Sequence, residues 1–352
     1  MKILFLYTGQ PRLVAETLVW HHYFHKRVLD KFEPEEEVTL DVKYVLWDYL
    51  TTPGHSDQFD GRVLVDTEQL VQDVKEYHNK NKYANRLDFL FYNYLEAEGF
   101  YKEFLENFPN YANSSRNFKK STFIPGVSQT LIRSLGVSSI DDDYEIVLIG
   151  RTDTLFDSLV ESSERLVNWI VDRCRHYKYL STTYKRTYFE FNEYPPTKKE
   201  YLMEDIFVPD LEYNQVLGPK AHDAMLIGSS NGFKIMYSGY KEKFMHWFKE
   251  RSSLIKGKWS YDNRTDVDVL GYDFNQIIDP HISTFGWIYC YSRQQELSDK
   301  VITIKDLLYI RDSLCLIRAE MSHVLPSDIS EMTDEYMVHT INYFRGRWRQ
   351  GE

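Results

Sequence analysis

The stretch YEIVLIGRTD, residues 144–153, contains the most β-like run of the chain and ends in a polar turn. Its apolar core, IVLI, has no polar break, which is typical of a strand buried on both faces of a parallel sheet. We therefore expect a strand over residues 144–149 with the polar turn at its carboxyl end. Because an extended backbone points residues i and i+2 to the same side, Arg151 and Asp153 are expected to share one face there.

A second buried strand is expected at the start of the chain. Residues 3–7 are an uninterrupted apolar run, which the turn-forming cluster TGQPR separates from a helical pattern over residues 13–32. A strand, a glycine-containing loop and a helix in this order form a βα unit of a parallel sheet. The later sequence predicts strands at residues 40–46, 62–65, 224–228, 282–291 and 314–317, and helices at residues 68–77, 85–108, 128–135 (closed by Gly136) and 232–249. A single α/β main domain with a Rossmann-type, mixed but mostly parallel sheet flanked by helices accommodates this order.

The composition is that of a globular protein. The 352 residues are 43% hydrophobic and 27% charged, which excludes a disordered chain. Aromatic residues make up 16%, a content that suits either a core of bulky side chains or a cleft whose rings stack on sugars or bases. The formal net charge of −11 argues against tight binding to nucleic acid, because such binding requires a basic face.

The three cysteines, Cys174, Cys290 and Cys315, are far apart and form no CxxC pair. The sequence therefore predicts neither a disulfide framework nor a zinc cluster, and it fits a reducing compartment. The opening residues MKILFLYTGQPR hold an apolar run too short for a signal peptide, and no later run is long enough for a membrane span. We expect a cytoplasmic protein.

Polar and charged side chains gather where the predicted strands end. In open α/β sheets ligands bind outside the carboxyl ends of the strands, so these residues are candidates for a site. They are Thr8, Gly9, Gln10 and Arg12 after the first strand, Trp47 and Asp48 after the second, Arg151 and Asp153 after the central one, and His222 and Asp223 just before residues 224–228. An arginine there can neutralise a pyrophosphate, and an aspartate can hold a divalent ion or orient a sugar hydroxyl. The alternative is an Arg151–Asp153 ion pair that only fixes the strand end.

Four segments together resemble the GT-A-type glycosyltransferases of bacterial lipopolysaccharide and capsular polysaccharide synthesis. They read YTGQPR at residues 7–12, LWD at 46–48, IGRTDTLF at 149–156 and HDAMLIGSS at 222–230. Their order and separations match that family over roughly residues 1–250. No single segment is specific for the family, but the four segments in this order are considerably stronger evidence for the resemblance.

The resemblance implies a GT-A-like fold and transfer of a sugar from a nucleoside-diphosphate sugar to a hydroxyl acceptor such as a saccharide. Residues 1–250 would form the nucleotide-sugar-binding core, and residues 251–352 an extension that completes the acceptor side on the same domain. The donor site that it implies consists of Thr8, Gly9, Gln10, Arg12, Trp47, Asp48, Gln129, Arg151 and Asp153. Asp223 is the implied general base, although it can equally cap a loop. His222, Trp259 and Asp262 are acceptor-side candidates.

Metal dependence is left open by the sequence. Members of this family commonly hold Mn²⁺ or Mg²⁺ with an Asp-x-Asp motif, and Arg151 occupies the place of its first acid. Asp153 is the remaining candidate ligand, which Asp223 or His281 could supplement. His21 and His25 lie four residues apart on a predicted helix, but no HExxH arrangement completes a metal site there.

Other functions fit parts of the sequence. A non-catalytic nucleotide- or carbohydrate-binding module would keep the same sheet. A nucleotidyltransferase is disfavoured, because TGQPRLVAE has one glycine and no lysine where that class carries a glycine-rich basic stretch. A viral-type DNA-modifying glycosyltransferase fits the fold but not the negative charge.

Overall fold

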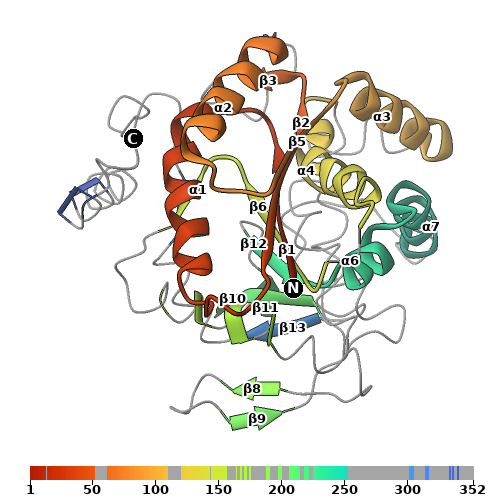
Figure 1. Cartoon of the computed structure of the whole chain (residues 1–352). Coiled ribbons are helices and arrows are strands. Elements are labelled where there is room, and N and C mark those ends of the chain that lie inside the picture. The colour runs from red at the N-terminus through yellow and green to blue at the C-terminus, as the bar shows by residue number, and fades with distance from the viewer. Residues whose placement is uncertain are drawn as a thin grey trace.

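The computed structural model describes most of the first half of the chain and shorter segments after it (Figure 1). The described residues are 1–12, 14–51, 62–109, 120–142, 144–156, 164, 167–168, 170–172, 174–175, 188–190, 197–199, 206–214, 218–221, 225–252, 301–304, 314–316, 333, 335–336 and 339–340. The strand predicted at residues 282–291 lies outside them. No helix in these ranges is long and apolar enough to cross a bilayer.

The fold is built on a mixed sheet that runs through its centre. Its strands lie in the order β11-β10-β12-β6-β1-β2-β5, and β13 pairs with β10. Four of the seven pairings, β1 with β2, β1 with β6, β2 with β5 and β10 with β13, are parallel. The bounds are β1 Lys2–Gly9, β2 Thr39–Trp47, β5 Arg86–Tyr92, β6 Ile146–Arg151, β10 Ile206–Asn214, β11 Gly218–Ala221, β12 Met225–Gly228 and β13 Val301–Ile304. The expected mixed, mostly parallel α/β sheet is thus confirmed.

Short strand pairs accompany the main sheet. They join β3 (Tyr49–Thr51) with β4 (Arg62–Leu64), β7 (Thr154–Phe156) with β14 (Leu314–Leu316), and β8 (Tyr188–Glu190) with β9 (Thr197–Lys199). Strands β13 and β14 come from the region after residue 250, and they pair with strands from before it. The division of the chain at residue 250 stays a prediction.

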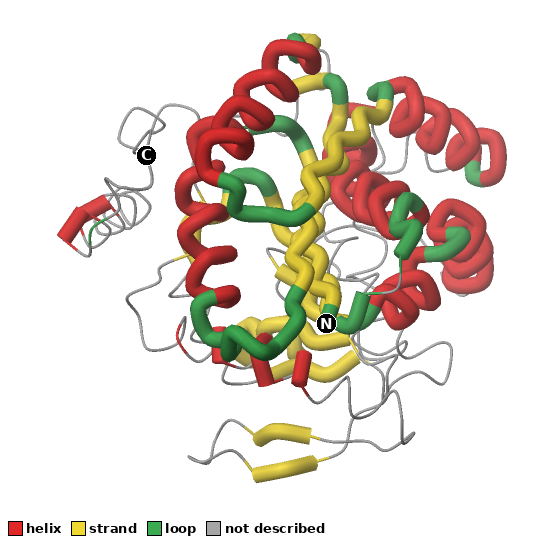
Figure 2. Tube along the Cα trace, viewed as in Figure 1, coloured by secondary structure: helices red, strands yellow, loops and turns green. Residues whose placement is uncertain are grey.

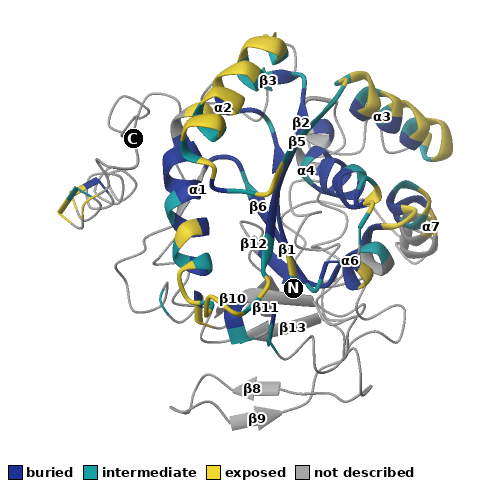
Figure 3. Cartoon of the chain, viewed as in Figure 1, coloured by how far each residue is buried: buried dark blue, intermediate teal, exposed yellow. Residues whose placement is uncertain are grey.

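Helices cover both faces of the sheet (Figures 1 and 2). Helices α1 (Val14–Leu29) and α2 (Thr67–Asn81) lie on one side, and α3 (Leu95–Asn107), α4 (Lys120–Ser138), α6 (Ser230–Tyr237) and α7 (Tyr240–Ser252) lie on the other. The alternation of β1 explains the two layers, because Phe5 and Tyr7 pack in one buried cluster while Leu4 and Leu6 pack in the other. Each buried side chain of this size contributes roughly 1.5–3 kcal/mol. Figure 3 shows the central strands as the most deeply buried part.

Two predicted helices are corrected. Residues 85–108 do not form one helix, because they divide into the edge strand β5 and helix α3. The segment RLDFLFY instead pairs in parallel with β2, and its side chains are half-buried, so its apolar pattern is too weak to separate strand from helix. Residues 232–249 are likewise divided between α6 and α7, with Gly239 in a left-handed conformation (φ 64°) between them.

Gly136 does not end its helix as predicted, since α4 continues to Ser138. It is instead the point where α4 approaches the sheet. A Cβ at this position would lie 3.4 Å from Thr8 Cγ2 and 3.5 Å from Val45 Cβ, so a larger side chain would push the helix away from β1.

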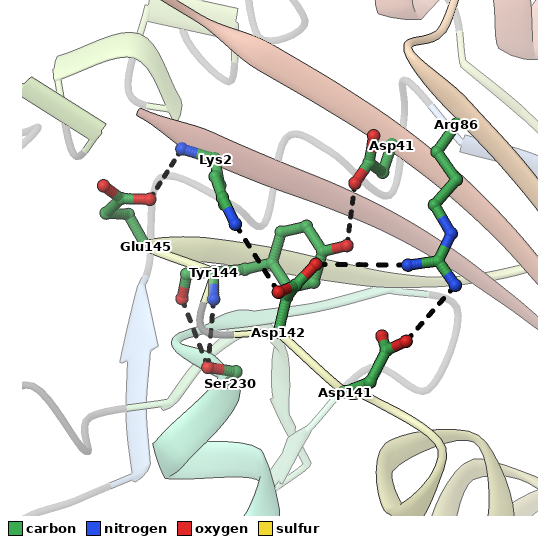
Figure 4. A network of polar contacts seen from close by, with 8 residues as sticks. All are labelled: Lys2, Asp41, Arg86, Asp141, Asp142, Tyr144, Glu145 and Ser230. Atoms are coloured by element: carbon green, nitrogen blue, oxygen red, sulfur yellow. Dashed lines mark hydrogen bonds and ion pairs between the residues drawn. The ribbon is translucent and has the colours of Figure 1, made fainter.

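Charged and polar side chains join the amino-terminal ends of the strands, opposite the candidate site (Figure 4). The Tyr144 hydroxyl donates to Asp41 at 2.8 Å, and the Arg86 guanidinium donates to Asp141 at 3.2 Å. The network connects Lys2, Asp41, Arg86, Asp141, Asp142, Tyr144, Glu145 and Ser230. It fixes this end of the sheet, and it supplies control positions that are remote from the site.

Candidate active site at the carboxyl ends of β1 and β6

The carboxyl ends of β1 and β6 bring two polar turns together. The strands are paired in parallel with Thr8 opposite Arg151, so residues 9–12 and residues 151–153 leave the sheet side by side. The turns therefore meet because of strand register. The two turns are far apart in the sequence, since Gln10 of one turn and Thr152 of the other are separated by 142 residues.

Arg151 and Asp153 form a two-pronged ion pair. Arg151 Nε donates to Asp153 Oδ1 and Nη2 donates to Oδ2, both at 2.9 Å. The carboxylate side chain is 9% exposed and the guanidinium side chain 25% exposed. The two side chains share one face, as their spacing predicted, and the ion pair considered as the alternative is present.

The charge state of Asp153 is set by opposing effects. Burial raises the pKa of its carboxyl group, but the charge and hydrogen bonds of Arg151, with the charge of Arg12, bring the pKa below its ordinary value. Asp153 is therefore ionised at neutral pH. The charges of both Arg12 and Arg151 act on this carboxylate, so two guanidinium groups belong to the same cluster.

The loop after β1 is held at Gly9 by helix α4. Gln129 Nε2 lies 3.3 Å from the Thr8 carbonyl oxygen and 3.2 Å from its hydroxyl oxygen. Gly9 has a φ of 135°, and a Cβ built on it would lie 3.1 Å from Gln129 Oε1. Glycine is thus required at this position both for the backbone conformation and for the close approach of the amide. Gln129 therefore contacts the loop after β1 directly.

The rest of the loop is connected to the turn after β6. The Gln10 side chain accepts a hydrogen bond from Arg12 Nε at 3.0 Å, and the Gln10 carbonyl accepts one from the Thr152 hydroxyl at 2.7 Å. The Thr152 carbonyl in turn accepts from the Thr17 hydroxyl of α1 at 2.9 Å. Sequence reasoning missed Thr17 and the role of Thr152, because nothing in a helix pattern shows which hydroxyl will face a distant turn.

The residues predicted after β2 have structural contacts. Trp47 is 1% exposed and packs in the core beside Tyr49, with ring centroids 6.0 Å apart. Asp48 Oδ1 accepts from the backbone N–H of Tyr94, the residue that precedes α3. Trp47 is thus a core residue and Asp48 holds the backbone before α3, and their predicted contacts with a donor stay predictions.

The histidines of α1 belong to a buried aromatic cluster. His25 Nε2 and the Tyr7 hydroxyl lie 2.8 Å apart, and the Tyr7 ring stacks on His21 with centroids 4.1 Å apart. His22 Nδ1 lies 2.9 Å from the Tyr77 hydroxyl. In the part of the chain that the structure describes, no three metal-binding side chains converge, so the histidines have no metal-ligand geometry.

The described residues do not fit Mn²⁺ or Mg²⁺ as they stand. Asp153 is the carboxylate at this strand end, and both of its oxygens accept hydrogen bonds from Arg151. Divalent ions need several oxygen ligands. His222, Asp223, Trp259, Asp262 and His281 lie outside the described residues, so their predicted roles stay predictions.

Comparisons with known proteins find similarity among solved structures. No family model matches the chain, and no curated protein matches it. The chain is similar to mouse xyloside xylosyltransferase 1 at 9% identity and a TM-score of 0.35, covering 86% of this chain and 85% of that one. It is also similar to galactosyltransferase LgtC, solved with donor and acceptor sugar analogs, at 10% identity and a TM-score of 0.32, covering 98% and 96%. Both are glycosyltransferases, the class that the sequence resembles. Because both TM-scores are below 0.5, the functional proposal rests on the site.

Proposed function

We propose that this protein is a glycosyltransferase that takes a sugar from a nucleoside-diphosphate sugar and transfers it to a hydroxyl acceptor, such as a saccharide. The observation that supports it is the pair of arginines, Arg12 and Arg151, around the buried Asp153 carboxylate at the carboxyl edge of a parallel sheet. This edge is where open α/β sheets bind ligands. Two guanidinium groups at one sheet edge suit a diphosphate, and Gly9 gives the loop after β1 a backbone conformation that other residues adopt only with strain.

The diphosphate would lie between the two polar turns. A guanidinium is a planar fork of N–H donors that matches the oxygens of a phosphate, and the pair with Asp153 holds the Arg151 guanidinium in a defined plane. Asp153 then acts as the residue that fixes the plane of Arg151. Arg12, oriented by Gln10, adds a second cation from the loop after β1.

In the transfer itself, the acceptor hydroxyl oxygen forms a bond to the anomeric carbon, and the bond from that carbon to the phosphate oxygen breaks. The nucleoside diphosphate leaves with the electron pair, and the acceptor proton passes to a base. Arg12 and Arg151 would stabilise the charge that develops on the leaving diphosphate. We propose Asp223 as the base in an inverting reaction, on the basis of the sequence.

A non-catalytic nucleotide- or carbohydrate-binding module is the second candidate. The observation that favours it is that Arg151 and Asp153 form a two-pronged ion pair, which a structural role for this turn would equally produce. Such a module would bind the nucleotide as tightly as the enzyme but would release no nucleoside diphosphate from the sugar donor.

A thermal-shift screen tests the proposal. UDP-, GDP-, CMP- and dTDP-sugars are compared with and without Mn²⁺, followed by an assay for nucleoside diphosphate release in the presence of saccharide acceptors. A donor at 100 times its dissociation constant adds about 2.7 kcal/mol of stability to the folded state. We expect stabilisation by one nucleotide class and turnover with that donor. Stabilisation without turnover favours the binding module, and no stabilisation by any donor contradicts both.

A further inference from the structure

The Thr152 side chain lies between the two polar turns and is 2% exposed. Its hydroxyl donates to the Gln10 carbonyl at 2.7 Å, and the backbone carbonyl of Thr152 accepts from the Thr17 hydroxyl at 2.9 Å. A buried hydroxyl that bridges two loops so far apart in sequence constrains the position of one loop relative to the other. A valine of the same shape would leave the Gln10 carbonyl without this donor.

Helix α1 contacts the backbone of Thr152 through Thr17. The Thr17 hydroxyl is 0% exposed and lies 2.9 Å from the Thr152 carbonyl, but 3.4 Å from the carbonyl of Val14 in its own helix. A hydroxyl has one hydrogen to donate, so the shorter contact receives it. Thr17 therefore ties the turn after β6 to α1 rather than stabilising its own helix.

The chain of contacts connects the two arginines. Thr152 is covalently flanked by Arg151 and Asp153, and through the Gln10 carbonyl it fixes the residue whose side chain orients Arg12. Two cations on separate loops can act together on one ligand only if the loops keep their spacing. The hydroxyl of Thr152 is a side-chain contact that bridges them.

We propose that Thr152, supported by Thr17, is a positioning residue that sets the spacing of Arg12 and Arg151 for a diphosphate. The inference rests on the proposed function and refines it. A diphosphate presents two adjacent phosphate groups, one for each guanidinium, whereas a monophosphate engages one cation at a time. Arg12 and Arg151, spaced by Thr152 and here called the clamp, therefore set selectivity for nucleoside diphosphates over monophosphates.

The test measures that selectivity by titration calorimetry. UDP, GDP, CDP and dTDP and their monophosphates are titrated into the native chain and into Thr152→Val, Thr152→Ser and Thr130→Val. Thr130 is the matched control, because it is a fully buried threonine of α4 that lies outside the two polar turns. Thr152→Val should weaken diphosphate binding about tenfold, the effect of one well-placed hydrogen bond to a preorganised site, and change monophosphate binding far less.

Thr152→Ser keeps the hydroxyl and should recover most of the lost affinity, while Thr130→Val should bind like the native chain. A merely structural role for Thr152 would weaken both ligands equally, so an unchanged diphosphate-to-monophosphate ratio overturns the inference. If Thr152→Val fails to fold, Thr17→Val, which leaves the turn itself intact, must show the same loss of selectivity. If the native chain binds no nucleoside diphosphate, the proposed function is overturned as well. If the native chain binds one and Thr152→Val has the same affinity ratio as the native chain, only the clamp is overturned.

Discussion

Replacing Asp153 with asparagine should uncouple Arg151 from the site while preserving the shape of the side chain. The asparagine keeps one oxygen for Arg151 Nε, but its amide nitrogen faces Nη2, where two donors now oppose each other. The guanidinium then loses the contact that fixes its plane. We expect Asp153→Asn to bind the donor more weakly and to lose transfer activity, with the overall fold retained.

The stability cost follows from the burial of the pair. Exposed ion pairs contribute about 0.2–1 kcal/mol, while breaking a fully buried pair costs about 3–5 kcal/mol. The Asp153 carboxylate is buried but a quarter of the Arg151 side chain is exposed, so the pair falls between these limits. We expect a loss of about 1–3 kcal/mol, or roughly 1–4 °C in melting temperature.

The assay combines thermal denaturation with titration calorimetry, and it uses Arg86→Lys as the control. Arg86 is also paired with an aspartate two residues away, Asp88, at 2.6 Å, but at the opposite end of the sheet. The control should lose little stability and no donor affinity. The reasoning is refuted if Asp153→Asn binds and transfers like the native chain, or if the control loses as much affinity.

Other perturbations give further expected outcomes. Gly9→Val should raise the donor dissociation constant about tenfold or more, because the left-handed backbone is strained and the new side chain displaces Gln129; Gly99→Val, at a position with open space around its Cβ, is the calorimetric control. Native turnover should persist in EDTA, and Arg151→Asp should make turnover depend on Mn²⁺; native activity that vanishes in EDTA and returns with Mn²⁺ would contradict this. Burial, with nearby histidines, lowers the pKa of His25, so the unfolded chain binds more protons below about pH 6.5 and stability is lost as pH falls through that value. His25→Gln should flatten part of this slope in melting temperature against pH, and an unchanged slope would count against it.

Strands β1, β2, β6 and β12 of the main sheet could be predicted because their runs are largely apolar. β1 and β6 are buried on both faces, so their runs of aliphatic residues stand out in the sequence. The edge strand β5 could not be separated from a helix, since it is half-buried and rich in Leu and Phe. Gly136 was misread because its role depends on the distance between α4 and β1, which no local pattern records.

The candidate site was predicted in part. The i and i+2 spacing at the end of β6 gave the shared face of Arg151 and Asp153, and strand order placed them beside the loop after β1. The contacts that hold the site, from Gln129 and Thr17, come from helices that pack on opposite faces of the sheet. Their partners are fixed by tertiary packing, so residue type and spacing alone could not identify them.

The central claim is that Arg12 and Arg151 bind the diphosphate of a nucleotide at the carboxyl ends of β1 and β6. Titration calorimetry of UDP, GDP, CDP and dTDP against the native chain, Arg12→Ala, Arg151→Ala and the remote control Arg86→Ala tests it most directly. One of the four nucleotides should bind the native chain and Arg86→Ala with equal affinity. It should bind Arg12→Ala and Arg151→Ala at least about tenfold more weakly, as expected for the loss of a charge-assisted contact. Equal binding to all four proteins, or no binding of any nucleotide to the native chain, would contradict the claim.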